Sequence, residues 1–104
     1  MLEILDEAKA EVRSAANRYR DQRPELAAAF LKSVREAYGR VAATPDAWPI
    51  WEMPGPELGV RRARLLRFPH RLLYVTEPRL VVIAVMHPRR EPTYWIRRLS
   101  TVRP

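Results

Sequence analysis

Residues 80–86 read Leu-Val-Val-Ile-Ala-Val-Met, an apolar run without a polar side chain. The run has the length of a strand and is far shorter than the roughly 18 apolar residues that a membrane span needs. A strand without polar alternation is covered on most of both faces. We therefore predict that this run is the central strand of a sheet.

Two further strands are predicted directly before this run, over residues 60–68 and 70–76. In the first of them Arg62 and Arg64 alternate with apolar residues, so one face of the strand is turned to water. Residues 77–78, a Glu-Pro pair, mark the turn into the apolar run. Connections this short favour an antiparallel sheet whose strands are neighbours in sequence order.

A short edge strand is predicted for residues 2–5, followed by two helices. The first helix is capped by Asp6 and ends near Asp21, and the second begins at Pro24 and closes at residues 44–45. Few residues separate the helices, so they fold back as an antiparallel hairpin. Apolar residues recur at helical spacing in both, namely Ala8, Val12, Ala15, Ala16 and Tyr19, then Ala27, Phe30, Val34, Ala37, Tyr38 and Val41.

Together these elements predict a single α+β domain over residues 1–104. A chain of this length forms one modest core. The N-terminal helical hairpin, preceded by its short edge strand, is expected to pack on one face of a small antiparallel sheet of three to four strands.

Residues 45–59 are predicted to form a loop, because neither helix nor sheet tolerates their four prolines and two glycines in series. Trp48 and Trp51 lie in this loop. Either they plug the loop onto the core, or they stack on bases or dock a partner.

The chain has no cysteine, which excludes a disulfide scaffold, a Cys-ligated metal and a thiol nucleophile. His70 and His87 are the only histidines, so we expect no metal and no other cofactor. The N-terminus lacks the basic segment and long apolar run of a signal peptide, and no apolar run is long enough to span a membrane. We therefore expect a cytoplasmic protein without a membrane partner.

The net charge of +7 is concentrated in the C-terminal half. Residues 1–59 carry eight basic and ten acidic side chains, whereas residues 60–104 carry eleven arginines and two glutamates. The planar arginine fork pairs with phosphate or carboxylate, so this one-sided clustering indicates an anionic partner.

Arg62, Arg64 and Arg71 form the first candidate site. If the helices cover the opposite face of the sheet, these three guanidinium groups share one open face. Their mutual repulsion is relieved when an anion binds there. The alternative is a basic face that is merely solvated.

The second candidate site is the loop of residues 87–95, which follows the central strand. We expect it to bring His87, Arg89 or Arg90, and Tyr94 beside the arginine face. Histidine and tyrosine can transfer protons, and arginine can stabilise the charge on phosphorus during RNA cleavage. RNA supplies its own nucleophile, the 2′-hydroxyl, so no metal is needed. The alternative is a structural histidine and an aromatic pair that closes the core.

Several short motifs, in their order and spacing, resemble the RelE/ParE superfamily of bacterial toxins over nearly the whole chain. The first motifs resemble the helical hairpin of that family, and the later ones resemble its central hairpin and closing segment. The matching stretches are residues 2–5, Ala8–Glu11–Ala15–Tyr19, residues 24–27 with Phe30, residues 60–62, 67–74 and 82–87, Arg89-Arg90 and Tyr94-Trp95.

This resemblance implies the toxin of a type II toxin–antitoxin system, which arrests growth until an acidic, amphipathic antitoxin segment covers its basic face in a hetero-oligomer. RelE-like members cut mRNA in the ribosomal A site, whereas ParE-like members poison DNA gyrase and are not nucleases. By position, the RelE-like basic residues fall on Arg62, Arg64 and Arg71, the later arginine on Arg89 or Arg90, and the tyrosine on Tyr94.

We therefore expect a metal-independent, ribosome-dependent mRNA endonuclease. Non-enzymatic inhibition of gyrase is the alternative, and a toxin that has lost its activity is a third possibility. Arginine cannot act as a general base at cellular pH. The proton of the 2′-hydroxyl would then move through His87 or Tyr94.

Overall fold

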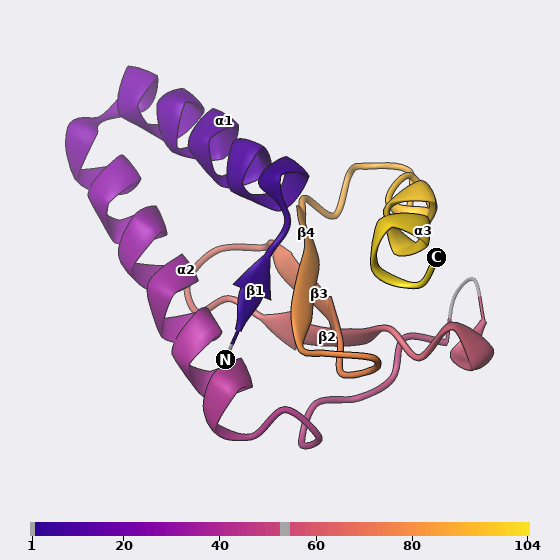
Figure 1. Ribbon diagram of the computed structural model, residues 1–104. Coiled ribbons are helices and arrows are strands. Elements are labelled where there is room, and N and C mark those ends of the chain that lie inside the picture. Colours follow the sequence, from indigo (N-terminus) through magenta and orange to yellow (C-terminus); the bar gives the residue numbers. More distant parts are fainter. Residues whose placement is uncertain (1, 53–54) are drawn as a thin grey trace.

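The computed structural model describes residues 2–52 and 55–104, and it confirms the predicted α+β fold. Two helices form an antiparallel hairpin on one side of a four-stranded sheet (Figure 1). In chain order the elements are β1 (Glu3–Ile4), α1 (Asp6–Gln22), α2 (Pro24–Ala43), a 3-10 turn (Pro56–Leu58), β2 (Arg61–Arg64), β3 (Arg71–Val75), β4 (Val81–Met86), a 3-10 turn (Ile96–Arg98) and α3 (Leu99–Val102).

The strand order is β1-β4-β3-β2, so the apolar run lies inside the sheet as predicted. Every residue of β4 is buried. β2, β3 and β4 pair antiparallel in sequence order, but β1 pairs parallel with β4 and makes the sheet mixed. The expectation of an entirely antiparallel sheet is therefore wrong for β1. Tight turns force antiparallel pairing, whereas the whole helical hairpin separates β1 from the other strands and leaves its direction free.

The apolar stripes predicted for the two helices pack together against the sheet. Ala8, Ala15 and Ala16 of α1 are buried, and so are Phe30 and Val34 of α2. They share one core with apolar residues of β2, β3 and β4. α1 begins at Asp6 itself, with Leu5 rather than Asp6 as the N-cap. The acidic first turn suits the positive end of the helix dipole.

The other face of the sheet carries a second core. Trp95, Leu99 and Val102 from the C-terminal segment pack against residues such as Leu73 and Ile83. Figure 1 shows α3 on the side of the sheet away from the two long helices. The face expected to be open is therefore partly covered, because the C-terminal segment folds back over β3 and β4.

Trp48 and Trp51 pack against the two cores, one on each. The guanidinium of Arg40 lies 5.8 Å from the ring centre of Trp48, and that of Arg62 lies 5.7 Å from the ring centre of Trp51. Both tryptophans are half-buried. This packing supports the interpretation that they fix the loop to the rest of the domain.

A β-bulge interrupts the pairing of β3 with β4. Leu73 pairs with Ala84 and Tyr74 pairs with Val82, which leaves Ile83 as the extra residue. β1 pairs with β4 only at residues 81 and 82, so among the described residues the outer edge of β4 has no strand beside it after that point. The bulge therefore precedes a stretch of free strand edge next to α1.

In the described part of the chain, no helix combines the length and apolarity needed to cross a membrane.

Candidate anion-binding site

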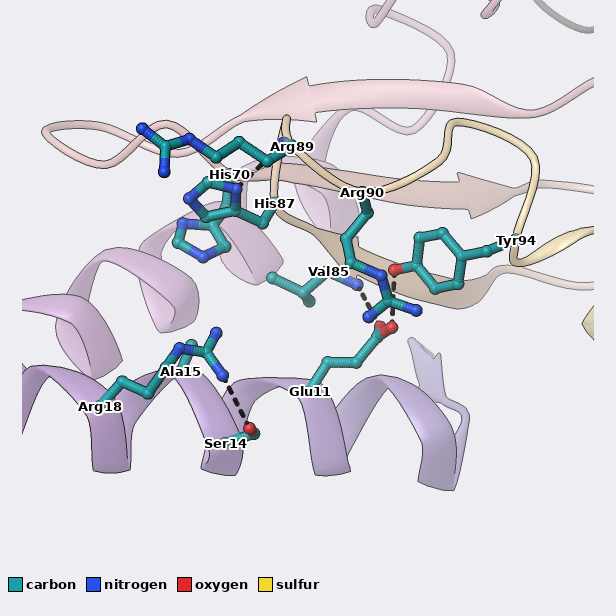
Figure 2. Close-up of a pocket in the computed structure, with 10 residues that line it drawn as sticks. All are labelled: Glu11, Ser14, Ala15, Arg18, His70, Val85, His87, Arg89, Arg90 and Tyr94. Atoms are coloured by element: carbon teal, nitrogen blue, oxygen red, sulfur yellow. Dashed lines mark hydrogen bonds between the residues drawn. The ribbon is translucent and has the colours of Figure 1, made fainter.

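A cavity of about 340 Å³ lies between α1 and the segment that follows β4 (Figure 2). All four residues proposed from the sequence for the loop line it, together with residues of α1, the residue that precedes β3 and a residue near the end of β4. The lining residues are Glu11, Ser14, Ala15, Arg18, His70, Val85, His87, Arg89, Arg90 and Tyr94. The loop thus faces the helical hairpin.

The arginine trio, Arg62, Arg64 and Arg71, lies apart from this cavity. Arg64 and Arg71 are register partners, and Arg62 lies two residues before Arg64 on the same strand. All three are therefore on one face of the sheet. That face is the one opposite Ala63, which contacts the helical core. Among the described residues, the cavity lining includes none of the trio. The four candidate residues of the loop face α1 and not the trio, whereas Pro92 of the same loop lines a separate hollow with Arg62.

Three arginines give the cavity a positive rim. Arg89 and Arg90 come from the loop, and Arg18 comes from α1, where its guanidinium donates to the Ser14 hydroxyl at 3.0 Å. All three side chains are exposed. An anion that enters the cavity therefore meets positive charge from two separate elements. Arg18 was not among the residues proposed from the sequence.

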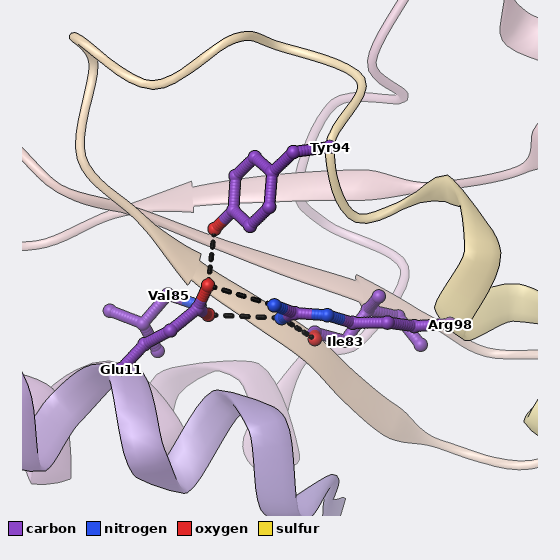
Figure 3. Close-up of polar contacts among 5 residues, drawn as sticks. All are labelled: Glu11, Ile83, Val85, Tyr94 and Arg98. Atoms are coloured by element: carbon purple, nitrogen blue, oxygen red, sulfur yellow. Dashed lines mark hydrogen bonds and ion pairs between the residues drawn. The ribbon is translucent and has the colours of Figure 1, made fainter.

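Glu11 is the acidic residue of the cavity wall, and its carboxylate is fully engaged (Figure 3). It accepts hydrogen bonds from the Val85 backbone amide at 3.0 Å and from the Tyr94 hydroxyl at 2.6 Å. Both terminal nitrogens of Arg98 also donate to it, at 3.1 and 3.0 Å. The Arg98 and Glu11 side chains are only 16% and 14% exposed. Glu11 is thus a paired structural charge rather than a free proton acceptor.

Arg98 and Glu11 together supply hydrogen-bond partners for backbone groups on the free edge of β4. Its guanidinium donates to the Ile83 carbonyl oxygen at 3.0 Å, while Glu11 accepts from the amide of Val85. These are the backbone groups beside the bulge that a neighbouring strand would otherwise satisfy. The ion pair therefore takes the place of a strand and joins α1, β4 and the C-terminal segment.

Tyr94 is a hydrogen-bond donor in this site. Burial, and then its hydrogen bond to the Glu11 carboxylate, raise the pKa of the Tyr94 phenol well above its ordinary value. The phenolate needed for a general base is therefore disfavoured at neutral pH. The surroundings of Tyr94 argue against the proton-transfer role suggested from the sequence.

His87 retains the properties of a proton acceptor. Partial burial, followed by the positive charges of Arg89 and Arg18, lowers the pKa of His87. This shift favours the neutral ring at pH 7. Nδ1 accepts a hydrogen bond from the backbone amide of Arg89 at 3.1 Å, which places the proton of the neutral ring on Nε2. Proton uptake at Nδ1 requires release of that amide.

His70 lies directly beneath the cavity and is only 2% exposed. It packs among aromatic rings, with its ring centre 4.9 Å from that of Phe30 and 5.1 Å from that of His87. Among the described residues, neither of its ring nitrogens has a hydrogen-bond partner. Burial, then His87 and Arg18, lower the pKa of His70 to about 4.

We expect His70→Phe to remove a large part of the acid sensitivity of the fold. The pKa of His70 falls from 6.5 to about 4, so the unfolded chain binds more protons between these pH values. Above pH 6.5 the ring is neutral in both states and adds no pH-dependent cost, and stability is lost as the pH falls toward 4. At pH 5 this loss is roughly 2 kcal/mol. Urea unfolding at pH 7.5 and pH 5 should show a smaller difference in the variant. If the loss of stability between pH 7.5 and pH 5 is the same in His70→Phe and in the native protein, His70 is not the source of the acid sensitivity.

Sequence reasoning assigned no role to Glu11, Arg98 or His70. One signal for Glu11 was present, because it interrupts the apolar stripe of α1 between Ala8 and Ala15. A carboxylate in such a position needs a buried partner. Nothing in the local sequence identifies that partner as Arg98, which lies 87 residues away.

No family model matches the chain, and no curated protein matches it.

Proposed function

We propose that this chain is the toxin of a type II toxin–antitoxin system and acts as a metal-independent, ribosome-dependent mRNA endonuclease. The observation that supports this proposal is the cavity, in which His87 stands beside Arg18, Arg89 and Arg90. Its volume of about 340 Å³ is that of a small-ligand site. Arginines on two sides suit a phosphodiester group, and the neutral histidine suits a proton acceptor.

The proposed reaction uses the RNA 2′-hydroxyl as the nucleophile. Its oxygen bonds to the adjacent phosphorus while its proton passes to His87. The bond from phosphorus to the 5′-oxygen breaks, which leaves a 2′,3′-cyclic phosphate and, after protonation by water, a 5′-hydroxyl. Arg89 and Arg90 stabilise the additional negative charge on the phosphate oxygens. Tyr94 transfers no proton in this scheme.

The arginine trio has a separate role in this proposal. Arg62 and Arg64 are exposed, and Arg71 is half-buried on the same face. This surface would hold phosphates of an extended nucleic acid outside the cavity. An acidic antitoxin segment that covers either basic surface would compete with RNA.

Non-enzymatic inhibition of DNA gyrase is the second candidate function. The observation that favours it is that two possible proton-transfer groups are already hydrogen-bonded. The Tyr94 hydroxyl donates to Glu11, and Nδ1 of His87 accepts from the amide of Arg89. A toxin that acts by binding alone requires neither group to be free.

Cell-free translation distinguishes the two candidates. The chain would be added to a reaction that contains ribosomes and a reporter mRNA, and the cut sites would be mapped by primer extension. We expect cuts in translated mRNA and none in the same mRNA without ribosomes. A parallel supercoiling assay with purified gyrase should show no inhibition. Intact mRNA together with inhibited gyrase would refute the nuclease proposal in favour of the second candidate.

A further inference from the structure

The Arg90 side chain lies over the ring of Tyr94 (Figure 2). Its guanidinium carbon is 3.9 Å from the ring centre, which is close for a cation–π contact. Arg90 is exposed, and among the described residues no hydrogen bond or ion pair holds its guanidinium. The Tyr94 ring is therefore the contact that places Arg90 at the cavity.

The ring of Tyr94 is itself held on two sides. Its hydroxyl donates to Glu11 at 2.6 Å, and the guanidinium carbon of Arg98 lies 5.1 Å from the ring centre. Glu11 is fixed in turn by Arg98 and by the Val85 amide at the free edge of β4 (Figure 3). A continuous set of contacts thus runs from the bulged strand to the exposed Arg90.

We infer that Tyr94 serves as an aromatic platform that holds Arg90 ready for a phosphate, and that Glu11 and Arg98 are positioning residues that hold this platform. The inference rests on the proposed function only where it names RNA phosphate as the partner of Arg90. The ordering of Arg90 itself is a property of the free protein.

The physical advantage of such a platform is lower entropy loss on binding. A free arginine side chain populates many rotamers, and a phosphate that binds it must select one of them. A guanidinium that already lies flat on a ring loses less freedom, and its N–H edge stays open to oxygen atoms. The ring is essential for this effect, whereas the hydroxyl only keeps the ring in place.

Comparison of Tyr94→Phe with Tyr94→Leu tests the platform. Phenylalanine keeps the ring and loses the hydrogen bond to Glu11, whereas leucine removes the ring. In ¹⁵N-labelled protein the Nε–Hε signal of Arg90, assigned by its absence in Arg90→Lys, should show restricted motion in the native protein and in Tyr94→Phe. It should show free motion in Tyr94→Leu. Equal motion in all three would overturn the inference.

Cleavage of ribosome-bound mRNA provides the functional test. We expect Tyr94→Phe to stay within about 5-fold of the native rate and Tyr94→Leu to fall by about 10-fold or more in kcat/KM, close to Arg90→Ala. If Tyr94→Phe falls as far as Tyr94→Leu, the hydroxyl is essential and the platform is refuted. If the native chain cuts no mRNA, the proposed function fails, while the motion of Arg90 still tests the platform.

Glu11→Leu tests the positioning role, because it leaves Tyr94 and Arg90 intact. The substitution removes the hydrogen bond to Tyr94 and, unlike Tyr94→Phe, also releases Arg98 from its ion pair beside the ring. We therefore expect increased motion of the Arg90 side chain and a change in the ring signals of Tyr94. Glu11→Gln, which can still accept from the Tyr94 hydroxyl, should restore most of the order. If Glu11→Leu does not fold, Tyr94→Phe and Glu11→Gln are compared instead, and the glutamine variant should hold Arg90 at least as firmly. Unchanged Arg90 motion in Glu11→Leu, or looser Arg90 in Glu11→Gln than in Tyr94→Phe, would refute the role of Glu11.

Discussion

Replacement of Arg98 by alanine is expected to lower the free energy of unfolding by about 3 to 5 kcal/mol. The substitution leaves the carboxylate of Glu11, which is only 14% exposed, without its opposite charge. It also removes the donor to the Ile83 carbonyl oxygen beside the bulge. Both losses destabilise the folded state, because water cannot fully replace a partner at a buried group. Urea unfolding measures the change, provided that the unfolding free energy depends on urea concentration with the same slope in both proteins.

The ion pair between Glu3 and Arg79 provides a matched control. Its nitrogen–oxygen distance of 2.7 Å is shorter than the 3.0 Å between Arg98 and Glu11, but its side chains are about half exposed. Solvent screening weakens such a pair. Arg79→Ala should therefore leave the urea midpoint almost unchanged. Equal effects of Arg79→Ala and Arg98→Ala would show that the Glu11 network adds no special stability.

His87→Ala is expected to slow cleavage of ribosome-bound mRNA by about 100- to 10,000-fold, the usual contribution of a general base. In the native protein the rate should rise with pH as His87 loses its proton. The pKa of His87 lies below its ordinary value of 6.5, so the rate should be constant around pH 7. Single-turnover cleavage measured from pH 5 to pH 8 would show both the loss and the pH profile.

A stability measurement is the control for His87→Ala. The residue is half-buried at the rim, and its side chain contacts His70. His87→Gln preserves much of the size of the side chain without a titratable ring, so it should unfold like the native chain and still cut slowly. Cleavage at the native rate in either variant would remove His87 from the mechanism and favour an inhibitor that performs no chemistry.

The local elements of this fold were predictable because short-range patterns produce them. The apolar residues of α1 and α2 recur every three to four positions, and most of them are buried in the structure, while Val12, Tyr19 and Tyr38 are half-buried. The continuous run of β4 marked a buried strand for a similar reason. Pairing across β2 and β3 followed from the short connection, which leaves two strands little choice of direction.

The candidate site could be predicted only in part. His87, Arg89, Arg90 and Tyr94 lie within eight consecutive residues, so one loop necessarily brings them near each other. Their neighbours on α1 could not be inferred in this way. The helix packs against the end of β4 in a register set by three-dimensional contacts, and only this packing brings Arg18 to the cavity.

By itself the sequence determined the two long helices, the buried central strand and the positive charge of the C-terminal half, because these depend on residues close together in the chain. The strand predicted over residues 60–68 is limited to Arg61–Arg64 in the structure, and α3 was not predicted. Only the tertiary structure decided that β1 pairs parallel with β4, that the candidate residues of the loop line a cavity with α1, and that Glu11 binds Tyr94 and Arg98. Each of these features joins segments far apart in sequence. Their geometry depends on how two cores and a bulged strand pack, and no local pattern contains that information.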